Sequence, residues 1–280
     1  MKTLTLILLA VLILDALAES LPGELKEEQK FGNYTVRVYR DDENASARFE
    51  VLRSGKRVYS KAGDRFNIGK IYYHDSDTNT TIKIGRSITS DRQPNLVVFE
   101  MAGGNNSDWT YYIFQIGNQF KLVSQIKGAY IEDPAFQDLR GDNNLEVVLG
   151  DNAFFYWNVC GADSQKMKVI LRYQSGRYAP DVELMRKPKP TAAELKRMAA
   201  EFKVKFHESN IGDEWGVPFA LWQEMLDEIY TGNSTSAWRL FDLSWPADRP
   251  GKEMFLQAFR KRLNTSQYYK DIMQPGFQGD

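Results

Sequence analysis

The sequence predicts an α+β protein with segregated elements, in which a β-rich domain over residues 19–187 precedes a small α-helical domain over residues 188–280. Three observations predict this division. Short runs of alternating apolar and polar residues, separated by turn signals, fill the first part. A stiff Lys-Pro-Lys-Pro linker occupies positions 187–190. Beyond the linker, apolar residues recur at the three- and four-residue spacing of amphipathic helices.

Residues 1–18 have the pattern of a secretory signal peptide. Lys2 precedes an apolar run over residues 4–14, and Ala-Leu-Ala at 16–18 forms a small-x-small cleavage site. The run is shorter than the roughly 20 residues of a membrane span, and Asp15 interrupts it, which counts against the alternative of an uncleaved anchor. We therefore expect a mature protein that begins near Glu19, is exported to the periplasm or secreted, and has no membrane span after cleavage.

The composition suits a folded protein that does not bind nucleic acid. With 280 residues, 42% of them apolar, the chain is long enough for two ordinary domains with real cores. The formal net charge of −1 argues against a nucleic-acid partner, because contact with phosphates needs a basic face. The single cysteine, Cys160, excludes an internal disulfide, and we interpret it as a small buried thiol.

The β-rich domain begins with a strand over residues 33–40, where apolar and polar residues alternate. Residues 48–60 then form a predicted hairpin with Ser54 and Gly55 at its turn, since glycine accepts the positive φ that such turns need. Further strands are predicted over residues 66–73, 81–85, 96–101, 110–116, 120–126, 146–149, 154–159 and 168–173. Regular short strands of this kind suggest a sandwich, a barrel or a propeller.

A capping box opens the helical domain, because Thr191 is followed three residues later by Glu194. Pro218 opens a second helix that Gly232 ends, and Ser234 is placed to cap a third. A fourth helix covers residues 254–263, a short one follows over 266–272, and we expect a frayed tail from residue 275. The tryptophans of this domain are interpreted as core residues first and as ligand-stacking platforms second: Trp215, Trp222, Trp238 and Trp245.

A polar loop with a buried strand after it occurs twice in the β-rich domain. The clearer copy begins at Asp138, and a weaker copy lies 51 residues upstream, where Asp91 aligns with Asp142 and Asn95 with Glu146. In the clearer copy, polar residues alternate at positions 138, 140, 142, 144 and 146. Loops with acids at alternate positions direct several oxygens to one point, which is the environment that calcium prefers.

This loop resembles the Asp-x-Asp-x-Asp-Gly-x-x-Asp loops of FG-GAP and VCBS repeats, the repeats of integrin-type β-propellers, over residues 81–173. The resemblance implies calcium as the cofactor, with four candidate ligands: Asp138, Asp142, Asn144 and Glu146. Arg140 departs from the pattern because it puts a cation at a ligand position, and Asn143 replaces the usual glycine. The alternative is that the acids cap turns without metal. Too few repeats are visible for a closed propeller, so the resemblance implies an incomplete, propeller-like domain.

Other motifs indicate a site less clearly. Residues 74–79 begin like an EF-hand loop, but Thr80 and Arg86 replace its glycine and its last glutamate, so a polar hairpin loop is the better interpretation. The Gly-Gly loop at 101–108 is interpreted as a turn, with ligand binding as the alternative. Gly-x-Ser-x-Gly, His-Glu-x-x-His and P-loop patterns do not occur, so no catalytic residue is assigned.

The arrangement is similar to that of exported bacterial proteins that join degenerate FG-GAP/VCBS-like repeats to a Trp-rich helical C-terminal region. We interpret the chain as an extracytoplasmic, non-enzymatic binding or interaction protein whose partner is an unknown protein or glycan of the cell envelope. The alternative is a cell-envelope hydrolase that acts on a glycan or peptide through paired carboxylates. Two close carboxylates with perturbed pKa values would favour the hydrolase, and a contiguous apolar surface patch would favour the binding protein.

Overall fold

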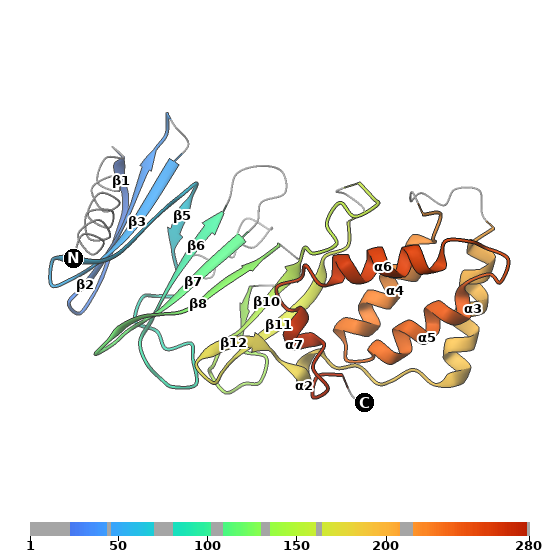
Figure 1. Cartoon of the computed structure of the whole chain (residues 1–280). Coiled ribbons are helices and arrows are strands. Elements are labelled where there is room, and N and C mark those ends of the chain that lie inside the picture. Colours follow the sequence, from blue (N-terminus) through green and yellow to red (C-terminus); the bar gives the residue numbers. More distant parts are fainter. Residues whose placement is uncertain are drawn as a thin grey trace, which may run out of the picture.

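The computed structural model describes residues 23–43, 46–69, 81–101, 109–129, 135–160, 164–207 and 215–278. The predicted signal peptide at 1–18, the candidate loop at 74–79 and the Gly-Gly loop at 102–108 lie outside these residues. The described part has an α+β architecture, with sheets along the N-terminal part and helices at the C-terminal end (Figure 1). None of its described helices is long and apolar enough to cross a membrane.

Three four-stranded antiparallel sheets follow one another along the chain (Figure 1). The first contains β1 (Glu24–Phe31), β2 (Tyr34–Asp41), β3 (Ser46–Arg53) and β4 (Lys56–Gly63). The second contains β5 (Phe66–Ile68), β6 (Asn95–Met101), β7 (Trp109–Ile116) and β8 (Phe120–Gly128). The third contains β9 (Phe136–Gln137), β10 (Glu146–Asp151), β11 (Met167–Gln174) and β12 (Arg177–Pro180). Each sheet pairs strands that are consecutive in sequence, and none of the three closes on itself within the described residues.

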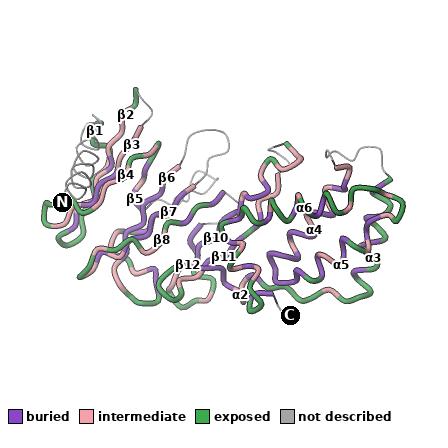
Figure 2. Tube along the Cα trace, viewed as in Figure 1, coloured by how far each residue is buried: buried purple, intermediate pink, exposed green. Residues whose placement is uncertain are grey.

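The second sheet is the middle layer of the stack, because alternate residues of its strands face opposite ways. Leu96 and Val98 of β6 pack in the core that the second sheet shares with the first. Val97 and Phe99 pack in a second core that continues through the third sheet into the helices. Figure 2 shows this as buried residues running along β6, β7, β10 and β11 and on into the helices.

The helical region comprises α2 (Val182–Met185), α3 (Ala192–Lys205), α4 (Phe219–Tyr230), α5 (Ser234–Ser244), α6 (Lys252–Leu263) and α7 (Tyr269–Ile272). The predicted capping box is confirmed, since Thr191 Oγ1 accepts from Glu194 N at 3.2 Å and Glu194 Oε2 accepts from Thr191 N at 2.7 Å. Gly232, with a φ of 87°, follows α4 as predicted. Of the tryptophans, Trp222 is wholly buried and Trp245 nearly so.

A buried carboxylate joins the third sheet to the helices. Asp151 at the end of β10 is 3% exposed, and its Oδ1 accepts from Ala153 N at 2.9 Å. Its Oδ2 accepts from the Tyr230 hydroxyl at 2.7 Å and from the Ser266 hydroxyl. Tyr230 ends α4 and Ser266 precedes α7, so one side chain connects three separate elements.

Two predicted strands were wrong. Residues 154–159 form successive turns, because Phe154 and Trp157 pack on the helices, with ring centroids 5.0 Å from Phe259 and 5.3 Å from Trp222. Residues 81–85 contain only a bridge followed by a turn, at which Gly85 has a φ of 88°. Strand β1 was not predicted, since it is an exposed edge strand without an apolar period.

Three smaller expectations are also corrected. Cys160 is exposed, because it follows the turns that replaced the predicted strand. Asn233, not Ser234, is the N-cap residue of α5. The tail is buried at Phe277 and Gln278, and the Gln278 side chain accepts from Ser234 N at 2.7 Å. The C-terminal segment thus satisfies a helix N-terminus that a local cap was predicted to satisfy.

Candidate functional site

The two polar loops of the repeat meet at the boundary between the second and third sheets. Leu145 N donates to Ile88 O at 3.0 Å, which joins the two copies directly. The buried Tyr178 hydroxyl also contacts both loops, at 3.5 Å from Ile88 O and 3.3 Å from Leu145 O. The similarity seen in sequence therefore corresponds to two loops that lie side by side.

Both loops close with the same hydrogen bond. In the upstream copy, Ile88 N donates to Asn95 Oδ1 at 2.9 Å, and in the downstream copy Leu139 N donates to Glu146 Oε2 at 3.0 Å. Both acceptors are buried at the start of a strand. A side-chain oxygen at this position thus fixes the loop that precedes each central strand.

The middle of each loop is also the same. Asp91 Oδ1 accepts from Gln93 N at 3.1 Å, and Asp142 Oδ1 accepts from Asn144 N at 2.9 Å. The residue after each aspartate has a positive φ, 54° at Arg92 and 64° at Asn143. These bonds are Asx turns, in which the carboxylate takes the place of a backbone acceptor.

The four predicted calcium ligands have oxygens that are largely used within the loop. Both carboxylate oxygens of Asp138 accept backbone N–H groups, from Asp142 and Asn143, each at 3.0 Å. Asp142 Oδ2 lies 3.5 Å from the Arg172 guanidinium. Glu146 is wholly buried, and burial raises the pKa of its carboxyl while Oε1 has no hydrogen-bond partner.

Arg140, the cation at a predicted ligand position, extends away from the loop. Its Nη2 contacts both carboxylate oxygens of Asp181 at 2.8 Å, and its Nη1 lies 2.8 Å from Glu183. Asp181 also caps α2 by accepting from two of its backbone amides. Arg140 therefore fixes the downstream loop to the segment that leads into the helices.

This donor set does not fit calcium well and fits turn capping better. In the described ranges, no group of three His, Cys, Asp or Glu side chains is arranged to hold a metal ion. Calcium wants six to eight convergent oxygens, whereas the carboxylates here accept backbone amides and contact Arg172. Calcium at Asp138, Asp142, Asn144 and Glu146 stays a prediction that unfolding measurements test.

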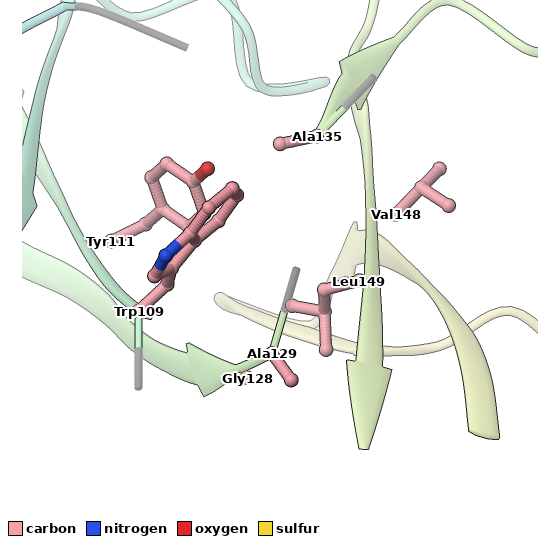
Figure 3. A pocket seen from close by; sticks show the side chains of 7 residues that line it. All are labelled: Trp109, Tyr111, Gly128, Ala129, Ala135, Val148 and Leu149. Carbon is pink, nitrogen blue, oxygen red and sulfur yellow. The ribbon is translucent and has the colours of Figure 1, made fainter. Parts of the chain in front are cut away.

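A small pocket between the second and third sheets is too small for a ligand (Figure 3). Its volume is about 10 Å³, roughly the space of one water molecule. Tyr111 lines it with a buried hydroxyl that has no hydrogen-bond partner, and burial raises the pKa of that phenol. We regard this pocket as part of the packing between two sheets.

Residues 154–158, Phe-Phe-Tyr-Trp-Asn, form a strained turn between the third sheet and the helices, which we name the aromatic segment. Tyr156 has a φ of 56° and is 58% exposed, and Asn158 has a φ of 58°. A positive φ is unusual for a bulky residue. The sequence predicted a strand here because the segment is rich in aromatic residues, which favour strands.

Polar contacts hold the aromatic segment in this conformation. Ser164 Oγ accepts from Tyr156 N at 2.8 Å and donates to Cys160 O at 2.9 Å. Arg262 of α6 donates to Phe155 O at 2.9 Å. Two buried donors near this turn have no hydrogen-bond partner: Asn158 Nδ2 within the segment, and Nε1 of Trp222, whose ring contacts Trp157.

Two carboxyl groups on α4 have raised pKa values, which sequence reasoning did not single out. Glu228 is 8% exposed, and burial, together with the nearby negative charges of Glu224 and Asp227, raises its pKa to about 7. Burial also raises the pKa of Glu224, one helical turn away. Lys187 lowers the pKa of Glu228, but its ammonium group already pairs with Asp227 at 2.7 Å.

Comparison with known proteins gives no match, whether with protein-family models, curated proteins or solved structures.

Proposed function

We propose that the chain is an exported, non-enzymatic binding protein of the cell envelope, and that it contacts its partner through the aromatic segment. The observation that carries this proposal is the exposed Tyr156 at a positive φ. A residue in this region costs about 1–3 kcal/mol, and such strain concentrates at functional sites. The Tyr156 ring lies edge-on to Phe155, with ring centroids 4.7 Å apart, and more than half of the residue is still exposed to a contact outside the chain.

The scaffold in this proposal is an incomplete propeller. Its support is that three four-stranded meanders stack in order, as the blades of a propeller do. The outer face of the first sheet carries ion pairs, such as Arg37 with Glu28 at 2.8 Å and Arg48 with Glu50 at 3.4 Å. A polar outer face ends such a stack without another blade. The helices cover its other end.

The partner that best fits the aromatic segment is a glycan. Sugar rings offer apolar faces that stack on tyrosine rings. Tyr156 offers such a ring, since 58% of the residue is exposed. A protein partner, which would use the exposed aromatic ring as an anchor, is the other form of the same proposal.

A hydrolase is the second candidate function, and the pair Glu224 and Glu228 is the observation that favours it. A carboxyl group with a pKa of about 7 suits general acid–base chemistry near neutral pH. In this reading Glu228 supplies the proton and Glu224 is its partner on the same helix.

Titration of the mature chain with soluble N-acetylglucosamine oligomers tests both functions. Tryptophan fluorescence reports binding, because Trp157 lies next to Tyr156, and chromatography reports the integrity of the oligomer. We expect saturable binding, intact oligomer, and about tenfold weaker binding in Tyr156→Ala, the loss of an aromatic anchor. The matched control is Met254→Ala, which removes a side chain that is 63% exposed on α6.

The outcomes separate the candidates. Cleaved oligomer, with cleavage lost in Glu228→Gln, would replace the binding function with the hydrolase. Absent glycan binding, together with failure of a photo-crosslinking residue at 156 to capture any envelope component in the organism of origin, would overturn the proposed binding face.

A further inference from the structure

An open cleft is lined by residues of the first sheet and by residues at the start of β5. Figure 1 shows these strands at the end of the molecule away from the helices. Its volume is about 630 Å³, within the range of about 300–1,000 Å³ in which small-molecule sites fall. Neither the two polar loops nor the aromatic segment contributes to its lining.

The floor of the cleft is apolar. It is formed by Val38 of β2, Ala47 of β3 and Phe66 of β5, which are 3%, 4% and 4% exposed and belong to the core between the two sheets. Because these side chains are almost wholly covered, they offer a ligand little apolar surface, and the accessible lining of the cleft is mainly polar.

The acids of the cleft are already engaged by neighbouring groups. Asp42 contacts Arg40 at 2.7 Å and Lys26 at 3.2 Å. Glu27 Oε2 accepts from Ile68 N at 3.2 Å, and its other oxygen accepts from the Gln29 amide at 2.9 Å. The two carboxylates that line the cleft therefore have little capacity left for a cationic ligand.

Donors, in contrast, remain available. Arg65 lines the cleft and is exposed, and its guanidinium has no ion-pair partner among the described residues. Asn67 lines the same cleft, and its Nδ2 is buried without a hydrogen-bond partner. Lys26, Arg40 and Arg65 together outnumber the two lining carboxylates, so the cleft is net cationic.

We propose that this cleft is a second binding site, for a small organic carboxylate. The carboxylate pairs with Arg65, whose planar fork matches two carboxylate oxygens. The site is independent of the proposed function of the aromatic segment, because the two share no residue.

Calorimetric titration of the mature chain with N-acetyl-phenylalanine tests the proposal, with N-acetyl-phenylalaninamide as the neutral probe. We expect saturable binding of the acid with a dissociation constant of about 1 mM or tighter, and binding of the amide about tenfold weaker. Arg65→Gln weakens acid binding by about tenfold. Lys121→Gln, the same charge change at an exposed residue of β8, leaves it unchanged.

Three results would each overturn the proposal: no saturable binding of the acid, equal binding of acid and amide, or unchanged binding in Arg65→Gln. Far-ultraviolet circular dichroism of each variant confirms that it is folded. Tyr156→Ala is expected to bind the acid with unchanged affinity. A failure of the glycan experiment would therefore not affect the conclusion about this cleft.

Discussion

Single buried carboxyl groups in this chain differ in how many donors reach them. Asp151 accepts from one amide and two hydroxyls, and it ties β10 to two helical elements. Glu146 accepts at one oxygen, while the other is buried without a partner. Glu228 Oε2 is also buried without a partner, and the neighbouring Glu224 and Asp227 add repulsion. A buried carboxylate that lacks hydrogen-bond donors is disfavoured relative to its protonated form. We therefore expect Glu228 to make the free energy of unfolding depend on pH.

Glu228→Gln is predicted to stabilise the fold at pH 8 and to have little effect near pH 4.5. The folded pKa of about 7 lies above the ordinary value of 4.5, so the folded state retains a proton that the unfolded state loses between these values. Stability therefore falls as pH rises through this window, and an uncharged glutamine removes that loss. After allowance for solvent screening, we expect on the order of 1 kcal/mol at pH 8, or about 2 °C in Tm.

Thermal unfolding at both pH values measures this effect. Glu253→Gln on the exposed face of α6 is the control, and it is expected to show no such pH dependence. An equal change in Tm at pH 4.5 and pH 8 for Glu228→Gln would show that burial does not raise the pKa of this carboxyl group.

At the scale of elements, the sequence predicted the helix caps and turns that depend on neighbouring polar residues. The capping box at Thr191 and the turn at Ser54 depend on neighbouring residues, and both are present. The repeat was detectable because Asp91 and Asp142 make the same local bonds. The aromatic segment was mispredicted because its aromatic residues pack on helices that are distant in sequence. The α5 cap was missed because it comes from Gln278, which is also distant in sequence.

The residues of the polar loop at Asp138 could be predicted from the sequence, but their contacts could not. Their spacing in sequence identified Asp138, Asp142, Asn144 and Glu146 as polar residues of one loop, and their role as calcium ligands stays a prediction. Whether their oxygens face a metal or backbone amides depends on the loop conformation, in particular on the positive φ of Asn143, which spacing does not determine.

Asp138→Ala is predicted to lower the Tm by a similar amount in EDTA and in millimolar calcium. The variant leaves two backbone amides in the loop without their acceptor, a loss of about 1–2 kcal/mol, or about 2–5 °C. Thermal unfolding of wild type and variant in both buffers measures it. A calcium-dependent rise in the wild-type Tm that disappears in Asp138→Ala would instead establish the metal site.

At the scale of the whole molecule, the boundary between the two hydrophobic cores does not coincide with the domain boundary that the sequence predicts. One core lies between the first and second sheets, and the other extends from the second sheet to the helices. The sequence places a boundary near residue 187, where the composition changes. The larger core nevertheless includes residues of the second sheet, the third sheet and the helices, and α4 lies against β11. Sequence patterns identify which residues are apolar but not which faces meet, so the continuity of this core was not predictable from periodicity.

A chain truncated to residues 19–187 is therefore predicted not to fold independently. Removing the helices would expose Phe154 and Trp157, and it would remove the hydroxyls of Tyr230 and Ser266 that hold Asp151. Losing the packing of two large aromatic side chains destabilises by several kcal/mol, on the order of the whole stability of a domain. Near-ultraviolet circular dichroism and dye binding compare the fragment with the mature chain, for which we expect fixed aromatic packing and little dye binding. A fragment with native-like aromatic signals and a cooperative transition would show that the sheets form a self-sufficient domain, and that the shared core is an interface between two domains.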